Sequence, residues 1–294
     1  MSKVYEIVTE QILEQLEQGV VPWSRPWKVD GLAPANLATG RAYRGINVLL
    51  LGFRAGSTPW WLTFRQAKAL GGRVLRGAKS APVVFWKWAE KRNAEAETQD
   101  EEKAERIPVL RYYRVFNLDQ TEGIDEERIP RLSTEEAVPV EAAEGIVAGY
   151  PDPPRVEHRA QPRACYAPAS DTVTMPPREV FESATGYYST LFHELAHSTG
   201  HVRRLGRPSF ERNHAAPFGS DEYAREELVA ELGAAFLCGE AGIDPDVPNS
   251  AAYLDHWRQK LSRNPRLLVT AAQQAQKAAD HILGRIGKEV DAVS

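Results

Sequence analysis

The sequence contains only two cysteines, no long hydrophobic run and no apolar segment at its start. Cys165 and Cys238 are too few for a disulfide scaffold in 294 residues, and they fit a reducing compartment. The longest apolar run, Ile46–Phe53, is far shorter than the ~20 residues that span a bilayer. The opening MSKVYEIVTEQ lacks the apolar region of a signal peptide. We therefore expect a cytoplasmic monomer with no membrane partner.

Acidic residues are scarce in the first third of the chain, although the net charge of the whole chain is −4. Residues 1–92 carry 14 basic and 6 acidic side chains, together with six of the seven tryptophans. Residues 93–154 carry 6 basic and 16 acidic side chains, and the remainder is close to neutral. The charge pattern therefore divides the chain into three zones.

Apolar periodicity and turn residues predict an α+β first zone with a small antiparallel sheet. Thr63 is placed to cap a helix that Gly71 and Gly72 end. The predicted helices span Ser2–Gln18, Ile46–Arg54 and Phe64–Leu70, and the predicted strands span Val74–Leu75, Val83–Trp88 and Leu110–Phe116.

The rest of the chain is predicted to be mainly helical. We expect a first domain over residues 1–125, an acidic, proline-rich linker over 126–154 and a second domain over 155–294. A strand over Asp171–Met175 is expected to stop at two prolines. The predicted helices span Glu141–Gly149, Ser183–Thr199, Glu222–Glu240, Ser250–Leu261 and Arg266–Ile286.

The strongest motif is HELAH, residues 193–197, within the apolar helical context YYSTLFHELAHSTGH. His193 and His197 are four residues apart, so a helix places both imidazoles on one face, where they can bind one ion. Glu194 lies close enough to accept a proton from a water molecule at that ion. This is the HExxH pattern of zinc peptidases. We expect zinc, with another divalent ion such as Mn2+ as the alternative.

The third metal ligand has two candidate sources. His201 lies eight residues after His193, about 12 Å along a continuous helix, so it can ligate only if the chain turns back at Gly200. The helix over 222–240 offers Glu227 and Glu231, which project together at i and i+4. We favour Glu227 as the ligand and Glu231 as the acceptor that orients a ligating histidine.

This donor set predicts metal-assisted hydrolysis, with Glu194 as general base and proton shuttle. The strand over Asp171–Met175 is a candidate edge strand for pairing with an extended peptide substrate. An ordinary internal strand is the alternative.

The basic, tryptophan-rich segment 21–92 predicts binding of single-stranded nucleic acid. Cations neutralise phosphates, and aromatic rings stack on unpaired bases. We assign Phe64, Trp86 and one of Trp60 and Trp61 to the core. For Trp23, Trp27 and Trp88, stacking and burial both remain open. The candidate DNA contacts are Trp23, Arg25, Trp27, Arg41, Tyr43, Arg44, Arg65, Lys68, Arg73, Arg76, Lys79, Lys87 and Trp88.

The sequence resembles the ArdC-type antirestriction proteins of conjugative plasmids. PWSRPW, ATGRAYRGINVLLL, WLTFRQAKALGGRVLRGAKSAPVVFWKW and YYRVFNLDQTEG resemble the family's single-stranded-DNA-binding domain. DTVTMPP, YYSTLFHELAHSTGHVRRLGR and YAREELVAELGAAFLC resemble its zincin-like metallopeptidase domain, of the HExxH gluzincin type. The resemblance implies protection of incoming plasmid DNA from host restriction during conjugation. It also implies His193, His197 and Glu227 as metal ligands and Glu194 as catalytic acid/base.

Three functions fit these features. The first is an antirestriction protein that binds single-stranded DNA and carries a peptidase-type metal site. The second is a zinc metalloprotease that its first domain delivers to a nucleic-acid-associated protein, such as a host restriction or regulatory protein. The third is a non-enzymatic DNA-binding protein with a structural metal site. The intact Glu194 argues against the third, since structural sites are normally closed by four protein ligands.

Overall fold

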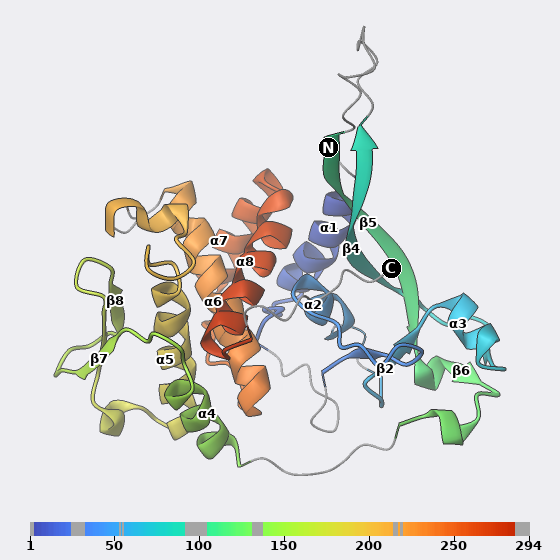
Figure 1. Ribbon diagram of the computed structural model, residues 1–294, viewed down its shortest axis with the longest axis horizontal. Coiled ribbons are helices and arrows are strands. Elements are labelled where there is room, and N and C mark those ends of the chain that lie inside the picture. The colour runs from blue at the N-terminus through green and yellow to red at the C-terminus, as the bar shows by residue number, and fades with distance from the viewer. Residues whose placement is uncertain are drawn as a thin grey trace, which may run out of the picture.

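The computed structural model describes residues 3–24, 33–52, 54, 56–91, 105–130, 138–213, 217 and 220–285. In Figure 1, a small sheet with short helices lies on one side of the molecule, and a group of longer helices with a second small sheet lies on the other. The predicted α+β class, with a sheet in the first half and mainly helices in the second, is confirmed.

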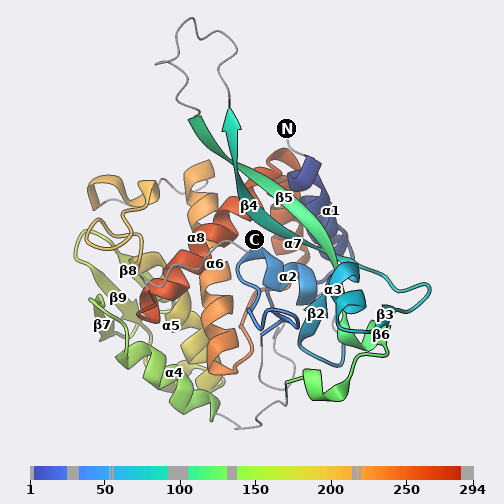
Figure 2. The same cartoon turned by 45° about the vertical axis from the view of Figure 1, so that its right-hand side comes forward.

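The sheet of the first half has the strand order β1-β2-β5-β4. β4 (Ala81–Lys91) and β5 (Glu105–Asn117) pair antiparallel over their whole lengths. Together they form a long twisted ribbon that projects from the body of the molecule (Figure 2). β2 (Trp60–Leu62) pairs antiparallel with β5, and β1 (Ala35–Asn36) runs parallel to β2.

The helices of the first half begin where the sequence predicts. Thr63 caps the third of them, because its hydroxyl accepts a hydrogen bond from the Gln66 N–H while the Gln66 side chain accepts one from the Thr63 N–H. The elements are α1 (Lys3–Glu17), α2 (Ile46–Gly52) and α3 (Phe64–Ala69), followed by the strand pair β3 (Arg73–Val74) and β6 (Thr121–Glu122).

The second half is built around α6, which packs against both α5 and α8. Ser220 begins α6 by accepting a hydrogen bond from the Tyr223 N–H, and Gly242, with φ of 73°, ends it. The helices are α4 (Pro139–Ala148), α5 (Ala184–Ser198), α6 (Asp221–Ala241), α7 (Ala251–Arg263) and α8 (Arg266–Ile282). Short 3-10 turns lie at Leu118–Gln120, Glu126–Arg128, Arg178–Val180 and Pro208–Asn213.

Of the two alternatives for the strand over Asp171–Met175, the structure shows the internal strand and excludes the edge strand. β9 (Thr172–Met175) lies between β7 (Arg155–His158), to which it is parallel, and β8 (Cys165–Ala167), to which it is antiparallel. Both sides of β9 are therefore already hydrogen-bonded. In this sheet the edges belong to β7 and β8.

One hydrophobic core joins the two halves. It contains Val8 and Ile12 of α1, Trp23, and residues of α5, α6 and α8 such as Leu228 and Leu268. α1 packs on α7 and α8, near the other end of the chain. The predicted division at residue 125 therefore does not coincide with a separation of cores.

The segment predicted as a linker also contains part of this core. α4 packs against α5 and α6, and Ala143 is completely buried. The Tyr188 hydroxyl donates a 2.8 Å hydrogen bond to Glu144. Residues 139–148 are therefore a structural part of the second half.

None of the helices in the described part of the chain has the length and apolar character of a membrane span.

Candidate metal centre

α5 holds two imidazoles on one face, as its sequence predicts. The Ser183 hydroxyl starts the helix by accepting a 3.0 Å hydrogen bond from the Gly186 N–H. His193 and His197 follow one turn apart, and their Nε2 atoms lie 3.1 Å from each other. Glu194 lies between them in the sequence and is buried. The two nitrogens are thus close enough to bind the same ion.

α6 contributes Glu227 to the same point. One Glu227 oxygen lies 3.6 Å from His193 Nε2, and the other lies 3.7 Å from His197 Nε2. Two ligands about 2 Å from one ion in tetrahedral geometry are about 3.3 Å apart, so these separations fit a single ion. The ligand atoms of the three residues all lie within 4.8 Å of one another. Two imidazoles and one carboxylate are also the donor set of catalytic zinc sites.

The candidate ligands His193 and Glu227 shift each other's pKa values in opposite directions. Burial alone would lower the pKa of His193, but the neighbouring carboxylates of Glu227, Glu194 and Glu231 raise it to about 9. Burial would likewise raise the pKa of Glu227, but His193 and His197 lower it to about 2. The acidic surroundings thus stabilise positive charge at this point, where a cation would bind.

Glu226, rather than the predicted Glu231, accepts a hydrogen bond from a histidine of the candidate ligand set. Its Oε1 lies 3.2 Å from His197 Nδ1, on the side of the ring opposite to Nε2. Arg207 fixes this carboxylate with hydrogen bonds of 2.9 and 2.5 Å, and both side chains are buried. The Arg207 charge keeps the pKa of Glu226 low despite burial, which by itself would raise it. Sequence reasoning missed Glu226 because acidic residues are common near the start of any helix, and it missed Arg207 because its partner lies on a different element.

Glu231 makes a different set of contacts. Its Oε2 accepts a 2.8 Å hydrogen bond from Trp23 Nε1 and another from the Tyr253 hydroxyl. Burial raises the pKa of Glu231 to about 7, even though both hydrogen bonds and the charge of His193 act to lower it. The predicted role of Glu231 in orienting a ligating histidine is therefore corrected to a link between α6, Trp23 and α7.

A cavity of about 380 Å3 opens onto the three ligands and Glu194. Tyr223, one turn before Glu227, lines it, and burial together with the charges of Glu227 and Glu194 raises its pKa to about 12. Its phenol therefore stays protonated at neutral pH. His201, the alternative third ligand, is buried and accepts a 3.2 Å hydrogen bond from the Arg203 N–H at Nδ1. It is not among the three converging ligands.

Two aromatic candidates for DNA contact are buried. Trp23 has no exposed surface, so its ring cannot stack on a base in this structure. Tyr43 is 6% exposed, and its hydroxyl accepts a 3.1 Å hydrogen bond from Asn36. Phe64, which the sequence analysis assigns to the core, is instead 60% exposed. Residues distant in sequence bury both rings, since Trp23 contacts Glu231 and Tyr43 packs with Val83 and Val115, and local patterns do not reveal such contacts.

The cationic candidates are mostly exposed, but two have acidic partners. Arg44 pairs with Asp280, and Arg73 pairs with Glu122 at 2.7 Å. Arg25 and Trp27 lie outside the described residues, as does the side chain of Trp88. The exposed candidates are Arg41, Arg65, Lys68, Arg73, Arg76, Lys79 and Lys87.

Comparison with protein families divides the chain in two. Residues 2–116 match the N-terminal domain of the anti-restriction factor ArdC, and residues 150–274 match a zincin-like metallopeptidase domain. A metal-free crystal structure of the antirestriction protein ArdC from plasmid R388 is 38% identical, with a TM-score of 0.75, and the match covers 96% of this chain and 97% of that one. The Mn(II)-bound structure of the same protein is 37% identical, with a TM-score of 0.72, and the match covers 97% and 98%.

Curated relatives contain the matching region within chains of different lengths. The uncharacterized protein y4eC of Sinorhizobium fredii is 36% identical over 94% of this chain and 90% of its own length. Two proteins of Escherichia coli named DNA primase TraC are 35% identical over 97% of this chain, which spans only 20% and 27% of their lengths. The extent of these matches and the arrangement of both halves lead to one conclusion: the chain belongs to the ArdC family of antirestriction proteins, with a zincin-like second domain.

Proposed function

We propose that this protein binds single-stranded DNA, carries a peptidase-type metal centre and protects incoming DNA from host restriction during conjugation. The observation that carries the enzymatic part is the convergence of His193, His197 and Glu227 beside Glu194 in an open cavity. The DNA-binding part is supported by the basic first third and its exposed cations. The proposed setting is the cytoplasm, the proposed state is a monomer, and the proposed ion is zinc, with manganese as the alternative.

Each residue of the centre has its own role in the proposed hydrolysis. A bound divalent ion would polarise a peptide carbonyl and lower the pKa of a water molecule. Glu194 accepts the proton of the attacking water and returns it to the leaving amine. Glu226 and Arg207 hold the ring of His197 in the orientation that directs Nε2 to the ion. Tyr223, protonated at neutral pH, can donate a hydrogen bond within the same cavity.

The position of β8 suggests how a peptide would bind. Cys165 and Tyr166 of this strand line the metal cavity. Among the described residues β8 pairs only with β9, so its other side forms an edge of the sheet. An extended peptide could add to this edge by backbone hydrogen bonds and lie across the cavity. We therefore transfer the proposed peptide-binding role from Asp171–Met175 to β8.

Glu194→Gln tests the proposal, because glutamine keeps the size of the side chain and removes the base. The control is Glu222→Gln, an exposed glutamate in the first turn of α6. We expect Glu194→Gln to retain the metal and to lose peptide hydrolysis by at least 100-fold, within the usual range for a general base. Hydrolysis at the unmodified rate would exclude the assigned chemistry.

The same variant separates the alternative functions when plasmid transfer into a restricting host is measured. Loss of protection with Glu194→Gln would indicate that cleavage of a host protein is required. Unchanged protection, with DNA binding intact, would favour a non-enzymatic DNA-binding protein whose metal site is structural.

A further inference from the structure

A groove of about 370 Å3 runs between the β4–β5 ribbon and α8, at the seam between the two halves. The start of α2 forms its floor. Val84 and Trp86 face it from β4, since residues two apart in a strand lie on the same side. This groove is separate from the metal cavity, with which it shares no lining residue.

Hydrogen bonds connect the floor of the groove to both of its walls. Asn47 at the start of α2 accepts a 2.7 Å hydrogen bond from the Val84 N–H and donates a 2.8 Å hydrogen bond to the Val84 carbonyl. The Gly45 N–H donates a 2.9 Å hydrogen bond to the Gln276 side chain on α8. The floor is thus tied to both walls, so the groove is formed in advance of any ligand.

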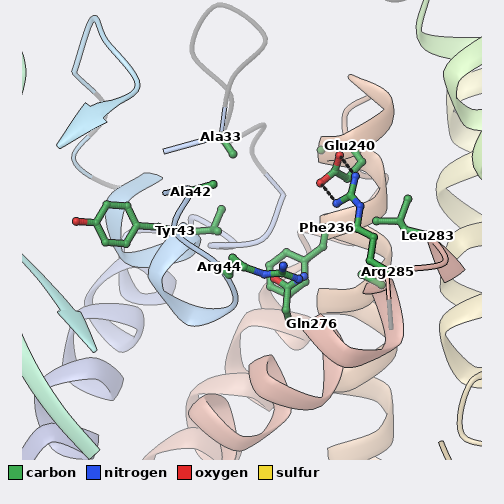
Figure 3. Close-up of a pocket in the computed structure, with 12 residues that line it drawn as sticks. Ala33, Ala42, Tyr43, Arg44, Phe236, Glu240, Gln276, Leu283 and Arg285 are labelled. Atoms are coloured by element: carbon green, nitrogen blue, oxygen red, sulfur yellow. Dashed lines mark hydrogen bonds and ion pairs between the residues drawn. The ribbon is translucent and has the colours of Figure 1, made fainter. Parts of the chain in front are cut away.

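The ionic groups deep in the groove satisfy one another. Arg44 pairs with Asp280, which also accepts a 3.2 Å hydrogen bond from Gln276. Figure 3 shows the Arg44 side chain pointing from the first half toward Gln276 of α8. Beyond them lies a smaller cavity of about 130 Å3, in which Arg285 is paired with Glu240 at 2.9 Å. These groups hold the seam together and leave little charge for a ligand.

Three side chains at the mouth of the groove remain available. Trp86 is half-buried and packs against the edge of the main core. Gln273 and Lys277 lie one turn apart on α8, line the same groove and are exposed. Neither of these two side chains makes a hydrogen bond or an ion pair with another described residue. The groove therefore offers a flat aromatic surface, a hydrogen-bonding amide and a free cation.

These groups fit a ligand with a flat ring, a polar ring edge and a negative charge. We propose that the groove binds one nucleotide of single-stranded DNA, with its base against Trp86, its base edge at Gln273 and its phosphate at Lys277. Stacked and paired bases in a duplex cannot enter such a groove, so the site selects unpaired strands. The proposal rests on the proposed DNA-binding function and moves a principal contact from the buried Trp23 to the seam.

The test measures binding of a fluorescent oligo-dT strand by anisotropy, using the full chain. Trp86→Leu keeps an apolar wall and removes the ring, and we expect about a ten-fold loss of affinity. Lys277→Gln should reduce the slope of log affinity against log salt by about one. Lys260→Gln on α7 is the matched control, because Lys260 is paired with Asp221 outside the groove. Thermal melting checks that each variant is folded.

Cross-linking supplies a second measurement that does not depend on a stable Trp86 variant. A strand containing 5-bromodeoxyuridine should cross-link to peptides with Trp86 or with residues 273–277. Wild-type protein that fails to bind the strand would overturn the proposed DNA-binding function and this inference with it. Wild-type binding with unchanged affinity and salt slope in both variants, or cross-links confined to residues 65–79, would overturn only the groove.

Discussion

Trp23 Nε1 donates a 2.8 Å hydrogen bond to Glu231, one turn beyond the candidate ligand Glu227. The indole also packs edge-on against Trp257, with ring centroids 6.0 Å apart. A residue from the start of the chain therefore reaches the helix that supplies the third ligand. This contact places the first half of the protein directly behind the metal centre.

Glu231→Gln should change how stability depends on pH in the metal-free protein. The pKa of Glu231 is raised to about 7 in the folded state, above its ordinary value of 4.5. The folded protein thus binds the proton more tightly, and this group's contribution to the unfolding free energy falls as pH rises from about 4.5 to 7. We expect the wild type to lose up to about 3 kcal/mol over this window relative to Glu231→Gln. Urea unfolding at several pH values measures the difference, and parallel curves would show that folding does not raise the pKa of Glu231.

One divalent ion should bind per chain, and either His193→Ala or Glu227→Ala should remove it. Metal bound only to the folded state raises the melting temperature, so wild-type protein should melt higher with zinc present and these variants should not. Metal analysis and thermal melting measure the two effects. Glu222→Ala, exposed on the same helix, is the control. Full metal content in Glu227→Ala, with loss in His201→Ala, would identify His201 as the third ligand.

Glu226→Gln should weaken metal binding without removing a ligand. The Arg207 guanidinium would lose its anionic partner, and His197 would lose the charged acceptor at Nδ1. Changes of this kind typically lower metal affinity by 10- to 100-fold. Competition with a chelator measures the affinity of this variant and of Glu231→Gln. An effect of Glu231→Gln alone would restore the role that the sequence first suggested for Glu231.

Replacing Arg73, Arg76 and Lys79 together should flatten the salt dependence of DNA binding. All three are exposed, and each phosphate contact releases condensed counterions when it forms. Because Arg73 is paired with Glu122, we expect it to contribute less than the other two. Titrations of oligo-dT at several salt concentrations measure the slope. A slope equal to that of wild type would place the phosphate contacts elsewhere.

The helices and the convergence of the candidate metal ligands were predictable from local signals and from the spacing of carboxylates on the next helix. Apolar periodicity predicted α5 and α6 to within one residue at each end. The HExxH spacing determines the geometry of His193 and His197 through the helix itself. The sequence also indicated Glu227, because it is one of few carboxylates in the next helix that can face α5.

Features that depend on distant partners were not predictable. Glu226 and Glu231 are both compatible with an amphipathic helix, and only the position of Arg207 and Trp23 in space determines which one faces His197. The sequence left open whether β9 is an edge or an internal strand, because its neighbour β7, with the sequence RVEH, has little strand signal of its own. Trp23 looked available to DNA because its partners lie more than 200 residues away.

The docking of α1 on α7 and α8 has a consequence for biosynthesis. α1 ends at Glu17, whereas α7 begins at Ala251, so the first helix leaves the ribosome more than 230 residues before its partners exist. At about 5–20 residues per second, this interval is roughly 10–50 s. During that time the apolar face of Val8, Ile12 and Leu16 lacks the surfaces that α7 and α8 provide. α1 therefore reaches its native packing only after α7 and α8 have been synthesised.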